Sequence, residues 1–275
     1  MGHTAPVMCM QINDSRLYSG SCDKSIRVWS LELFRCLSVI SGNISAVKLI
    51  SVFASRLISV GKVIFSIIQG ARVALVWNLM SKKAASPKVL DKHASIITAI
   101  AQDHQYIVTA CSNSRIVLWR SDTLEMLTSI NDYRRGIKCL SYIFPFIFTV
   151  SSDRALRVVD IRTKTRIFTS ASQTENIRSL AVNENILLLG TQHGHALKFD
   201  ITHMGLNVKP VEKYLDILNE REDIEIGFGP VYSMNICGAK ILYLTSKNFL
   251  TVYNYLDSSW DHSSIRKSRI TLSTY

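Results

Sequence analysis

The stretch Ser19–Trp29, SGSCDKSIRVW, decides how the rest of the chain is read. It begins with small residues, passes through a polar turn at Asp23, and ends in an alternating strand that closes on Trp29. Two interpretations are open at this point. Asp23 could belong to a chemical site, or the stretch could be one unit of a repeated architecture, and a search for further copies distinguishes the two.

The same pattern recurs five times along the chain. The copies end at Trp77, Trp119, Val159, Phe199 and Tyr253, so the successive intervals from Trp29 are 48, 42, 40, 40 and 54 residues. The middle of this series matches the period of about 40–45 residues that is typical of a four-stranded propeller blade.

Each copy lies among other short strands. An apolar strand precedes it, a second apolar strand leads into its turn, and another strand follows the closing aromatic or apolar residue. Helical periodicity is almost absent, so the pattern predicts an all-β repeat fold with about four strands in each unit. Such a unit cannot bury its faces alone, and neighbouring units must therefore stack.

These residues carry a family resemblance: the sequence resembles a WD40-repeat β-propeller over residues 2 to 256. The first unit matches best, because Gly2 and His3 fit the family's Gly-His pair, Asp23 its turn aspartate and Trp29 its third-strand tryptophan. Ser30 departs from the Asp that follows this tryptophan in the family. The resemblance implies a buried hydrogen-bonded tetrad, whose roles fall to His3, Ser19, Asp23 and Trp29. A buried carboxylate needs such donors to offset its desolvation.

The other units keep less of this pattern. In the third unit His93, Thr109, Asn113 and Trp119 take the tetrad positions, with Asn in place of Asp. The fourth keeps Thr149 and Asp153 but has Val159 in place of Trp, and the fifth ends in Phe199-Asp200. The second and sixth units are expected to keep only the apolar skeleton.

We therefore expect one propeller domain over residues 1–275, with six recognisable four-stranded blades. A ring of seven blades, or a fragment of one, stays open as an alternative. The expected blades are 2–40, 41–90, 91–130, 131–170, 171–226 and 227–275.

Two stretches interrupt the period. An apolar insertion at 62–70 lengthens the second unit, and an acidic one at 205–226 lengthens the fifth. For the acidic stretch we expect a surface loop, with a short helix over 214–222, that is either solvated or a docking site for a partner. The segment after Tyr255 is expected to supply a last outer strand with exposed cations.

Composition limits the function classes. Charged residues make up 19% of the chain, and the net charge of +11 favours acidic partners. None of the six cysteines forms a CxxC pair, and the plain interpretation is buried thiols in a reducing compartment, the cytoplasm or nucleus. The apolar runs are shorter than the roughly 20 residues of a membrane-spanning helix, so no membrane insertion is expected.

No catalytic or metal-binding motif stands out. The chain has no GxSxG, P-loop or HExxH sequence, and its one close histidine pair, His193 and His195, falls where other units have the turn aspartate. Ser, His and Asp of the first unit resemble a catalytic triad, but a nucleophile must be reachable and this network is expected to be buried. We expect no enzyme activity and no cofactor.

Three functions remain. The first is a protein-interaction scaffold in a larger complex. The second rests on Val159–Arg162, which resembles the WDxR box of substrate receptors for cullin-RING ubiquitin ligases; there the Asp and Arg face the ligase adaptor, and Asp160 and Arg162 match them. The third is association with RNA or ribonucleoprotein, with basic pairs as phosphate contacts: Arg134 and Arg135, Lys82 and Lys83, Arg266 and Lys267.

Overall fold

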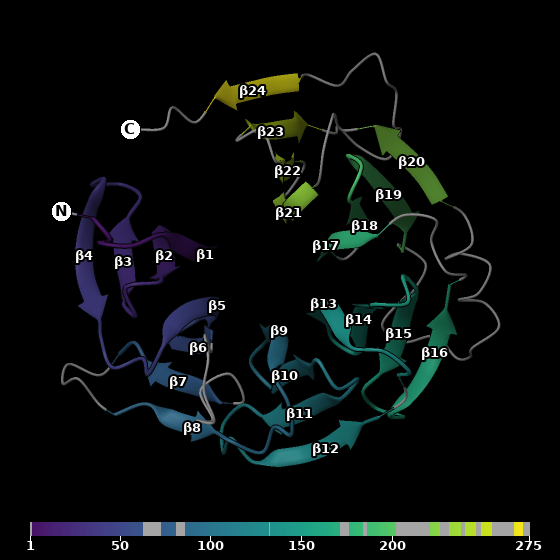
Figure 1. Cartoon of the computed structure of the whole chain (residues 1–275), viewed down its shortest axis with the longest axis horizontal. Helices are drawn as coiled ribbons and strands as arrows, with labels where there is room; N and C mark the ends of the chain where they lie inside the picture. Colours follow the sequence, from purple (N-terminus) through teal and green to yellow (C-terminus); the bar gives the residue numbers. More distant parts are fainter. Residues whose placement is uncertain are drawn as a thin grey trace. The chain divides into compact units, whose positions relative to one another are not determined.

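A computed structural model describes most of the chain as strands and short turns. The described residues are 2–62, 73–80, 86–131, 133–170, 176–183, 186–201, 221–225, 231–237, 240–245, 249–254 and 267–271. Side chains are described up to residue 201, apart from those of residues 62 and 200. The described strands form six four-stranded sheets, and Figure 1 labels the strands of each in chain order. The all-β prediction with four strands in each unit is thereby confirmed.

The first compact unit of the chain is Met1–Ile137. It contains three antiparallel sheets whose strands pair in the order of the sequence. Their strands are β1 (Val7–Asn13), β2 (Arg16–Ser21), β3 (Ile26–Ser30), β4 (Arg35–Ile40); β5 (Ala46–Phe53), β6 (Arg56–Lys62), β7 (Ala74–Asn78), β8 (Lys88–Leu90); and β9 (Ile97–Gln102), β10 (Tyr106–Cys111), β11 (Ile116–Arg120), β12 (Met126–Ile130).

The second compact unit is Lys138–Tyr275, and its first strand begins at the boundary residue Ile137. It contains the other three sheets, again paired in sequence order. Their strands are β13 (Ile137–Ile143), β14 (Phe146–Ser151), β15 (Leu156–Asp160), β16 (Thr165–Thr169); β17 (Ile177–Val182), β18 (Ile186–Thr191), β19 (His195–Asp200), β20 (Arg221–Glu225); and β21 (Val231–Cys237), β22 (Lys240–Thr245), β23 (Phe249–Asn254), β24 (Lys267–Thr271). β24 is the last outer strand that the sequence predicted.

The middle sheet of the first unit is buried on both faces. Successive side chains of a strand point to opposite faces, so Leu57 packs into the core shared with the first sheet and Ile58 into the core shared with the third. Likewise, Leu75 packs into the core shared with the first sheet and Val76 into the core shared with the third. This explains why β6 and β7 read as continuous apolar runs rather than as alternating ones.

The first two sheets of the second unit enclose one apolar core. Its members come from β14 to β19 and the segments next to them, and they include Phe148, Leu156, Leu187 and Phe199. All six residues of β14 are buried. The apolar run Cys139–Val150 therefore forms most of β13 and most of β14, two strands of a sheet, rather than a membrane helix. Among the described residues there is no helix with the length and apolarity needed to span a membrane.

The turns between second and third strands share one backbone conformation. Lys24, Ser114 and Arg154 have φ values of 66°, 70° and 67° in the first, third and fourth sheets, and Gly194 has 101° in the fifth. L-residues other than glycine rarely adopt this left-handed region. In the first and fourth sheets this conformation is held by the bonds described below.

The acidic stretch at 205–226 differs from the loop that we expected. Its end, Arg221–Glu225, is strand β20, which pairs antiparallel with β19, so the helix expected over 214–222 is wrong at its last two residues. An outermost strand tolerates charged residues because one edge is left open to water. Residues 202–220 lie outside the described part of the chain, as do 63–70 of the apolar insertion.

Candidate functional site: hydrogen-bonded networks in the first four sheets

The first sheet brings the four predicted tetrad residues together. The indole Nε1–H of Trp29 donates to the Ser19 hydroxyl at 2.8 Å, and His3 Nε2 lies 2.7 Å from the same oxygen. His3 Nδ1 lies 2.8 Å from Asp23 Oδ2. The bonds are satisfied in one direction: Ser19 O–H donates to Nε2, and Nδ1–H donates to Asp23. This series of hydrogen bonds links Trp29, in the third strand, to His3, which precedes the first strand.

Asp23 is the end point of this series of hydrogen bonds and accepts three further contacts. Its Oδ1 receives the backbone N–H and the hydroxyl of Ser25 at 2.9 and 2.6 Å, and its Oδ2 receives the N–H of Thr4 at 3.1 Å. Burial by itself raises the pKa of Asp23, but the bonds from Ser25, His3 and Thr4 together outweigh it and hold the pKa well below its usual value. The carboxylate thereby fixes the left-handed turn at Lys24.

The network does not present a reactive group to solvent. Ser19 is 3% exposed, and its oxygen already accepts the hydrogen of Trp29 Nε1. A nucleophile has to reach its substrate, so the likeness to a Ser-His-Asp triad is one of residue types only. Among the described residues, no group of three His, Cys, Asp or Glu side chains is arranged to hold a metal ion.

The third sheet keeps three members of the tetrad. His93 Nε2 lies 2.9 Å from Thr109 Oγ1, and Trp119 Nε1 donates to the same oxygen at 3.0 Å. His93, Thr109 and Trp119 are buried, whereas Asn113 stands exposed on the turn. The Asn therefore takes the position of the turn aspartate without its burial.

The second sheet contains a network that the sequence interpretation missed. Trp77 Nε1 donates to Ser59 Oγ, and that hydroxyl donates to Asn43 Oδ1, both at 2.8 Å. The expectation that this unit keeps only an apolar skeleton is therefore wrong. Asn43 precedes Ser59 by the same sixteen residues that separate His3 from Ser19, and this spacing was the signal to follow. The spacing was missed because Asn43 stands where the first and third sheets have a histidine.

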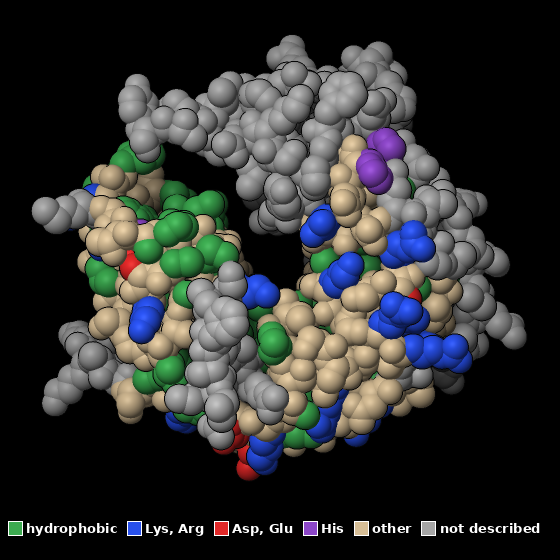
Figure 2. Space-filling model, viewed as in Figure 1, with side chains coloured by type: hydrophobic (Ala, Val, Ile, Leu, Met, Phe, Trp, Pro, Cys, Tyr) green, Lys and Arg blue, Asp and Glu red, His purple; other side chains and the backbone are tan. Residues whose placement is uncertain are grey.

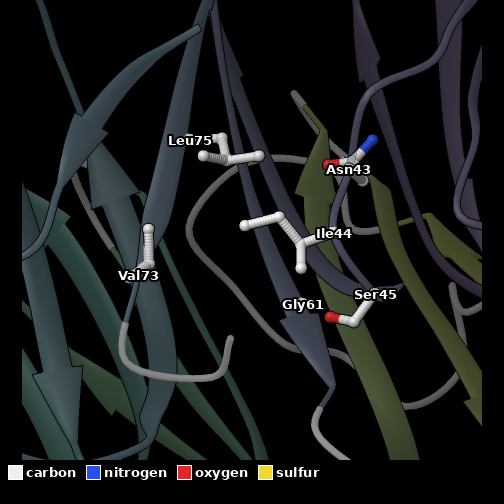
Figure 3. Close-up of a pocket in the computed structure, with 6 residues that line it drawn as sticks. All are labelled: Asn43, Ile44, Ser45, Gly61, Val73 and Leu75. Atoms are coloured by element: carbon white, nitrogen blue, oxygen red, sulfur yellow. The ribbon is translucent and has the colours of Figure 1, made fainter. Parts of the chain in front are cut away.

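A small pocket lies beside this network. Figure 3 shows Asn43, Ile44 and Ser45 lining it from the segment before β5, together with Gly61, Val73 and Leu75. Its volume of about 10 Å³ has room for a single water molecule. It holds nothing the size of a metabolite.

The fourth sheet replaces the histidine with an arginine. Arg157 donates through Nη1 to Ser151 Oγ at 2.6 Å and to Asp153 Oδ1 at 3.0 Å, and through Nη2 to Asp153 Oδ2. Hydrogen bonds from Arg157 are the largest cause that lowers the pKa of Asp153 far below its usual value. Tyr133, sixteen residues before Thr149, is buried where other sheets have His or Asn.

Asp153 should make stability depend on acid pH. A carboxyl group whose pKa is lower in the folded state stabilises the fold above its unfolded pKa of about 4, and this contribution is lost as the pH falls through the folded value. We expect the free energy of unfolding to fall between pH 4 and pH 2, and to fall less steeply in Asp153→Asn. Urea titrations at several pH values measure it. Parallel curves for the two proteins would contradict the assignment.

The remaining predicted residues lie at the surface or near it. Asp160 Oδ1 accepts the N–H of Arg162 at 2.8 Å, and Asp160 Oδ2 accepts from Arg162 Nη2 at 2.7 Å; the Asp160 side chain is 8% exposed and that of Arg162 44%. The guanidinium lies 6.0 Å from the centre of the Phe146 ring, within cation–π range. Arg134 and Arg135 are exposed just before β13. Lys82, Lys83 and Arg266 lie outside the described residues, and Lys267 begins β24.

Arg56 is a structural residue that sequence reasoning did not single out. Its guanidinium joins the second sheet to the third, because it donates to Gln102 Oε1 at 2.6 Å, to Ser121 O at 2.7 Å and to Asp103 O at 2.5 Å. Burial lowers its pKa, and Asp103 partly opposes this effect. An arginine at a strand start carries no signal in one sequence that distinguishes this role from a solvated charge.

Comparison with known proteins agrees with this geometry. The model of the family "WD domain, G-beta repeat" matches residues 1–30 and 85–120, the segments that hold the tetrad positions of the first and third sheets. The chain is 27% identical over 168 residues to "WD repeat-containing protein pop2" of Schizosaccharomyces pombe, covering 51% of this chain and 24% of that protein. It is 26% identical over 162 residues to "p21-activated protein kinase-interacting protein 1-like" of Danio rerio, covering 58% and 41%. The match thus spans less than half the length of either curated relative.

Solved structures share the fold at low identity. A computationally designed protein, Ika8, superimposes with a TM-score of 0.69 at 18% identity, over 92% of this chain and 72% of that one. The structure of U3-55K gives 0.72 at 14% identity, over 92% and 79%, and a chain of the mitotic checkpoint complex gives 0.73 at 12%, over 94% and 77%. At these identities the likeness establishes the fold alone.

Proposed function

Because the chain is a WD40-repeat β-propeller protein, we propose that it acts as a non-catalytic scaffold, one subunit of a larger protein complex. The networks around Ser19, Ser59 and Thr109 support this proposal, since their polar groups are used to hold strands and turns together. Rigid sheets of this kind present their turns and edges to partners. The relative from Danio rerio is named for an interaction with a protein kinase.

One observation carries the proposal: the turn after β3 exposes large apolar side chains. Leu33 is 59% exposed and Phe34 90%, and Phe34 has a left-handed φ of 48°. At the corresponding turn of the third sheet Leu124 packs against the core, and at that of the fourth the residue is Lys164. An exposed aromatic residue on a fixed turn is typical of an anchor that enters a pocket on a partner.

The test compares two matched variants. Asn tolerates the left-handed region, so Phe34→Asn removes the ring without straining the turn, and Lys164→Asn makes the same change at the corresponding turn of the fourth sheet. We expect the tagged wild type to elute from native extract in a stoichiometric complex, and Phe34→Asn to recover about tenfold less of that partner. Lys164→Asn should recover the wild-type amount. A wild type that elutes only as a monomer contradicts the proposal.

A second function, as substrate receptor of a cullin-RING ubiquitin ligase, is favoured by the geometry at Asp160. Asp160 and the ring of Phe146 hold the half-exposed Arg162 guanidinium in one place, where it could meet an adaptor. We expect Arg162→Ala to recover less ligase adaptor than wild type in a pull-down at equal thermal stability. Equal recovery of adaptor by both proteins would argue against this role.

The thiols support a reducing compartment for either role. Cys9, Cys22, Cys36, Cys111 and Cys139 are free, and burial raises the pKa of Cys9 to about 12 and that of Cys139 to about 11. Thiols held protonated in this way are poor nucleophiles. The cytoplasm or nucleus is accordingly our proposal for where the complex forms.

A further inference from the structure

A pocket of about 360 Å³ lies between the second and third sheets, both of which belong to the first compact unit. Ligand pockets commonly enclose about 300–1,000 Å³, so this one has room for a ligand, unlike the pocket beside Asn43. Arg56, Asn78 and Lys88 line it from the second sheet. Leu124, in the turn after β11, lines it from the third. We name this space the inter-sheet pocket.

Arg56 forms a fixed wall of the inter-sheet pocket. Its Nε–H donates to Gln102 Oε1, its Nη1 to the backbone oxygen and the hydroxyl of Ser121, and its Nη2 to the backbone oxygen of Asp103. All four acceptors are uncharged. Because a guanidinium has five N–H groups, one Nη2 hydrogen is left without an acceptor in the described part of the chain. Burial lowers the pKa of Arg56, and the charge of Asp103 opposes only part of this effect.

Two further residues bring hydrogen-bond donors to the inter-sheet pocket. Asn78 Oδ1 already accepts the N–H of Met80 at 2.9 Å, so the side chain has its two amide hydrogens to offer. Lys88 is exposed, and within the described residues it makes no hydrogen bond or ion pair. A ligand that supplies acceptors therefore fits this side of the pocket.

One acidic group lies at the inter-sheet pocket as well. Asp122 is the single carboxylate among the described lining residues, and its Oδ1 accepts the N–H of Thr123 at 2.7 Å. Figure 2 shows Asp and Glu side chains next to Lys and Arg side chains between β8 and β12. The lining thus sets two cations, Arg56 and Lys88, against one carboxylate. A carboxylate on the ligand matches this lining, because hydrogen bonds between charged groups are the stronger ones.

Apolar groups complete the lining of the inter-sheet pocket. Val76 and Trp77 are each 8% exposed. Leu124, which has a left-handed φ of 63°, packs against the core shared by the second and third sheets. Apolar walls around a few polar groups are typical of a binding pocket. The ligand that fits both parts carries an apolar side chain beside its carboxylate.

The inter-sheet pocket lies at the same end of the first unit as the turn at Phe34. The side chain of Gln11 bonds to the backbone N–H and oxygen of Val52 at 2.7 and 3.1 Å. The thiol of Cys9 lies 3.9 Å from the backbone oxygen of Val47, so β1 and β5 run side by side in the same direction. The turns after β3 and β7 therefore lie at the same end of their sheets. A partner that covers this end meets both the turn at Phe34 and the pocket.

We propose that the inter-sheet pocket binds an acidic side chain of an extended segment of a partner protein, together with a neighbouring apolar side chain. The carboxylate meets Arg56 and Lys88, and the apolar side chain packs beside Leu124. This inference deepens the scaffold function proposed above and rests on it for the choice of a protein ligand.

The test measures binding of the peptide acetyl-Gly-Leu-Glu-Leu-Gly-amide to the full chain by ligand-detected NMR, up to about 5 mM peptide. Two matched peptides have Gln or Lys in place of Glu. The variants are Lys88→Gln and Asp122→Asn, and the control is Lys92→Gln, at an exposed position outside the pocket. All three side chains are exposed, and circular dichroism melting verifies that the variants fold.

We expect wild type to bind the Glu peptide with a dissociation constant of about 1 mM or below, and the Gln peptide at least about fivefold more weakly. Lys88→Gln should weaken binding of the Glu peptide about threefold, because it removes an attractive charge. Asp122→Asn should strengthen it about twofold, because it removes a repulsive one. Lys92→Gln should bind as wild type does.

Four results would overturn the proposal. Wild type does not bind the Glu peptide, it binds the Gln peptide equally well, it prefers the Lys peptide, or Lys88→Gln binds the Glu peptide as tightly as wild type. If Lys88→Gln does not fold, Asp122→Asn alone is measured, and an unchanged affinity counts against the proposal.

This test separates the inter-sheet pocket from the scaffold function. Phe34→Asn should bind the Glu peptide as wild type does, because Phe34 does not line the pocket. A protein that forms its complex through Phe34 but does not bind the peptide contradicts this inference alone. A protein that binds the peptide but elutes only as a monomer contradicts the scaffold function alone.

Discussion

Trp119→Ala is expected to lower the free energy of unfolding by about 3–5 kcal/mol, the largest single-residue effect that we predict. Trp119 is 2% exposed and packs in the core between the second and third sheets. Its ring centre lies 5.1 Å from that of His93, and its Nε1–H is bonded to Thr109. The substitution leaves a cavity and removes the donor to a buried hydroxyl.

Urea denaturation of the variant measures this loss, and Trp29→Ala is the matched control. Trp29 occupies the same position in the first sheet but is only half-buried, so its loss should cost less. Trp119→Phe should fall between wild type and Trp119→Ala, because it keeps most of the apolar area. A loss below about 1 kcal/mol for Trp119→Ala would show that the core recloses around the cavity.

Asp23→Ala should destabilise the first sheet by about 1–3 kcal/mol, because His3, Ser25 and Thr4 lose their shared acceptor. The turn at Lys24 also loses the bond that holds its left-handed conformation. The midpoint of thermal unfolding measures the change. Asp91→Ala, at an exposed position before the third sheet, is the control and should leave the midpoint unchanged. A midpoint for Asp23→Ala equal to that of wild type would contradict the structural role of the network.

The fold was predictable because the pattern of strands survives where the motif residues do not. Strand β14 in the fourth unit and β18 in the fifth are recognisable from apolar residues alone, since both faces of these strands are buried. The period of about 40 residues then fixes the order of the sheets. β20 could not be predicted, because its residues REDIE are charged except for one and do not stand out from the acidic stretch before them.

The networks were predictable only where the residue types match the family. In the fourth sheet Arg157 holds Asp153 in place of a histidine, and it comes from the third strand rather than from before the first. No spacing rule derived from His3 and Asp23 finds such a partner. In the second sheet the spacing from Asn43 to Ser59 was intact, but an amide does not resemble an imidazole in a sequence search.

The left-handed turns are stabilised in two chemically different ways. In the first and fourth sheets a carboxylate at the residue before the turn accepts the N–H two positions on, from Ser25 and from Ala155. The fifth sheet has Gly194 at the left-handed position, where a residue without Cβ carries no strain, and the hydroxyl of Thr191 bonds His195 instead. A glycine can therefore substitute for an aspartate in holding this corner. A protein engineer could use that exchange at Lys24 or Arg154: glycine there should partly rescue a turn whose acidic residue has been removed.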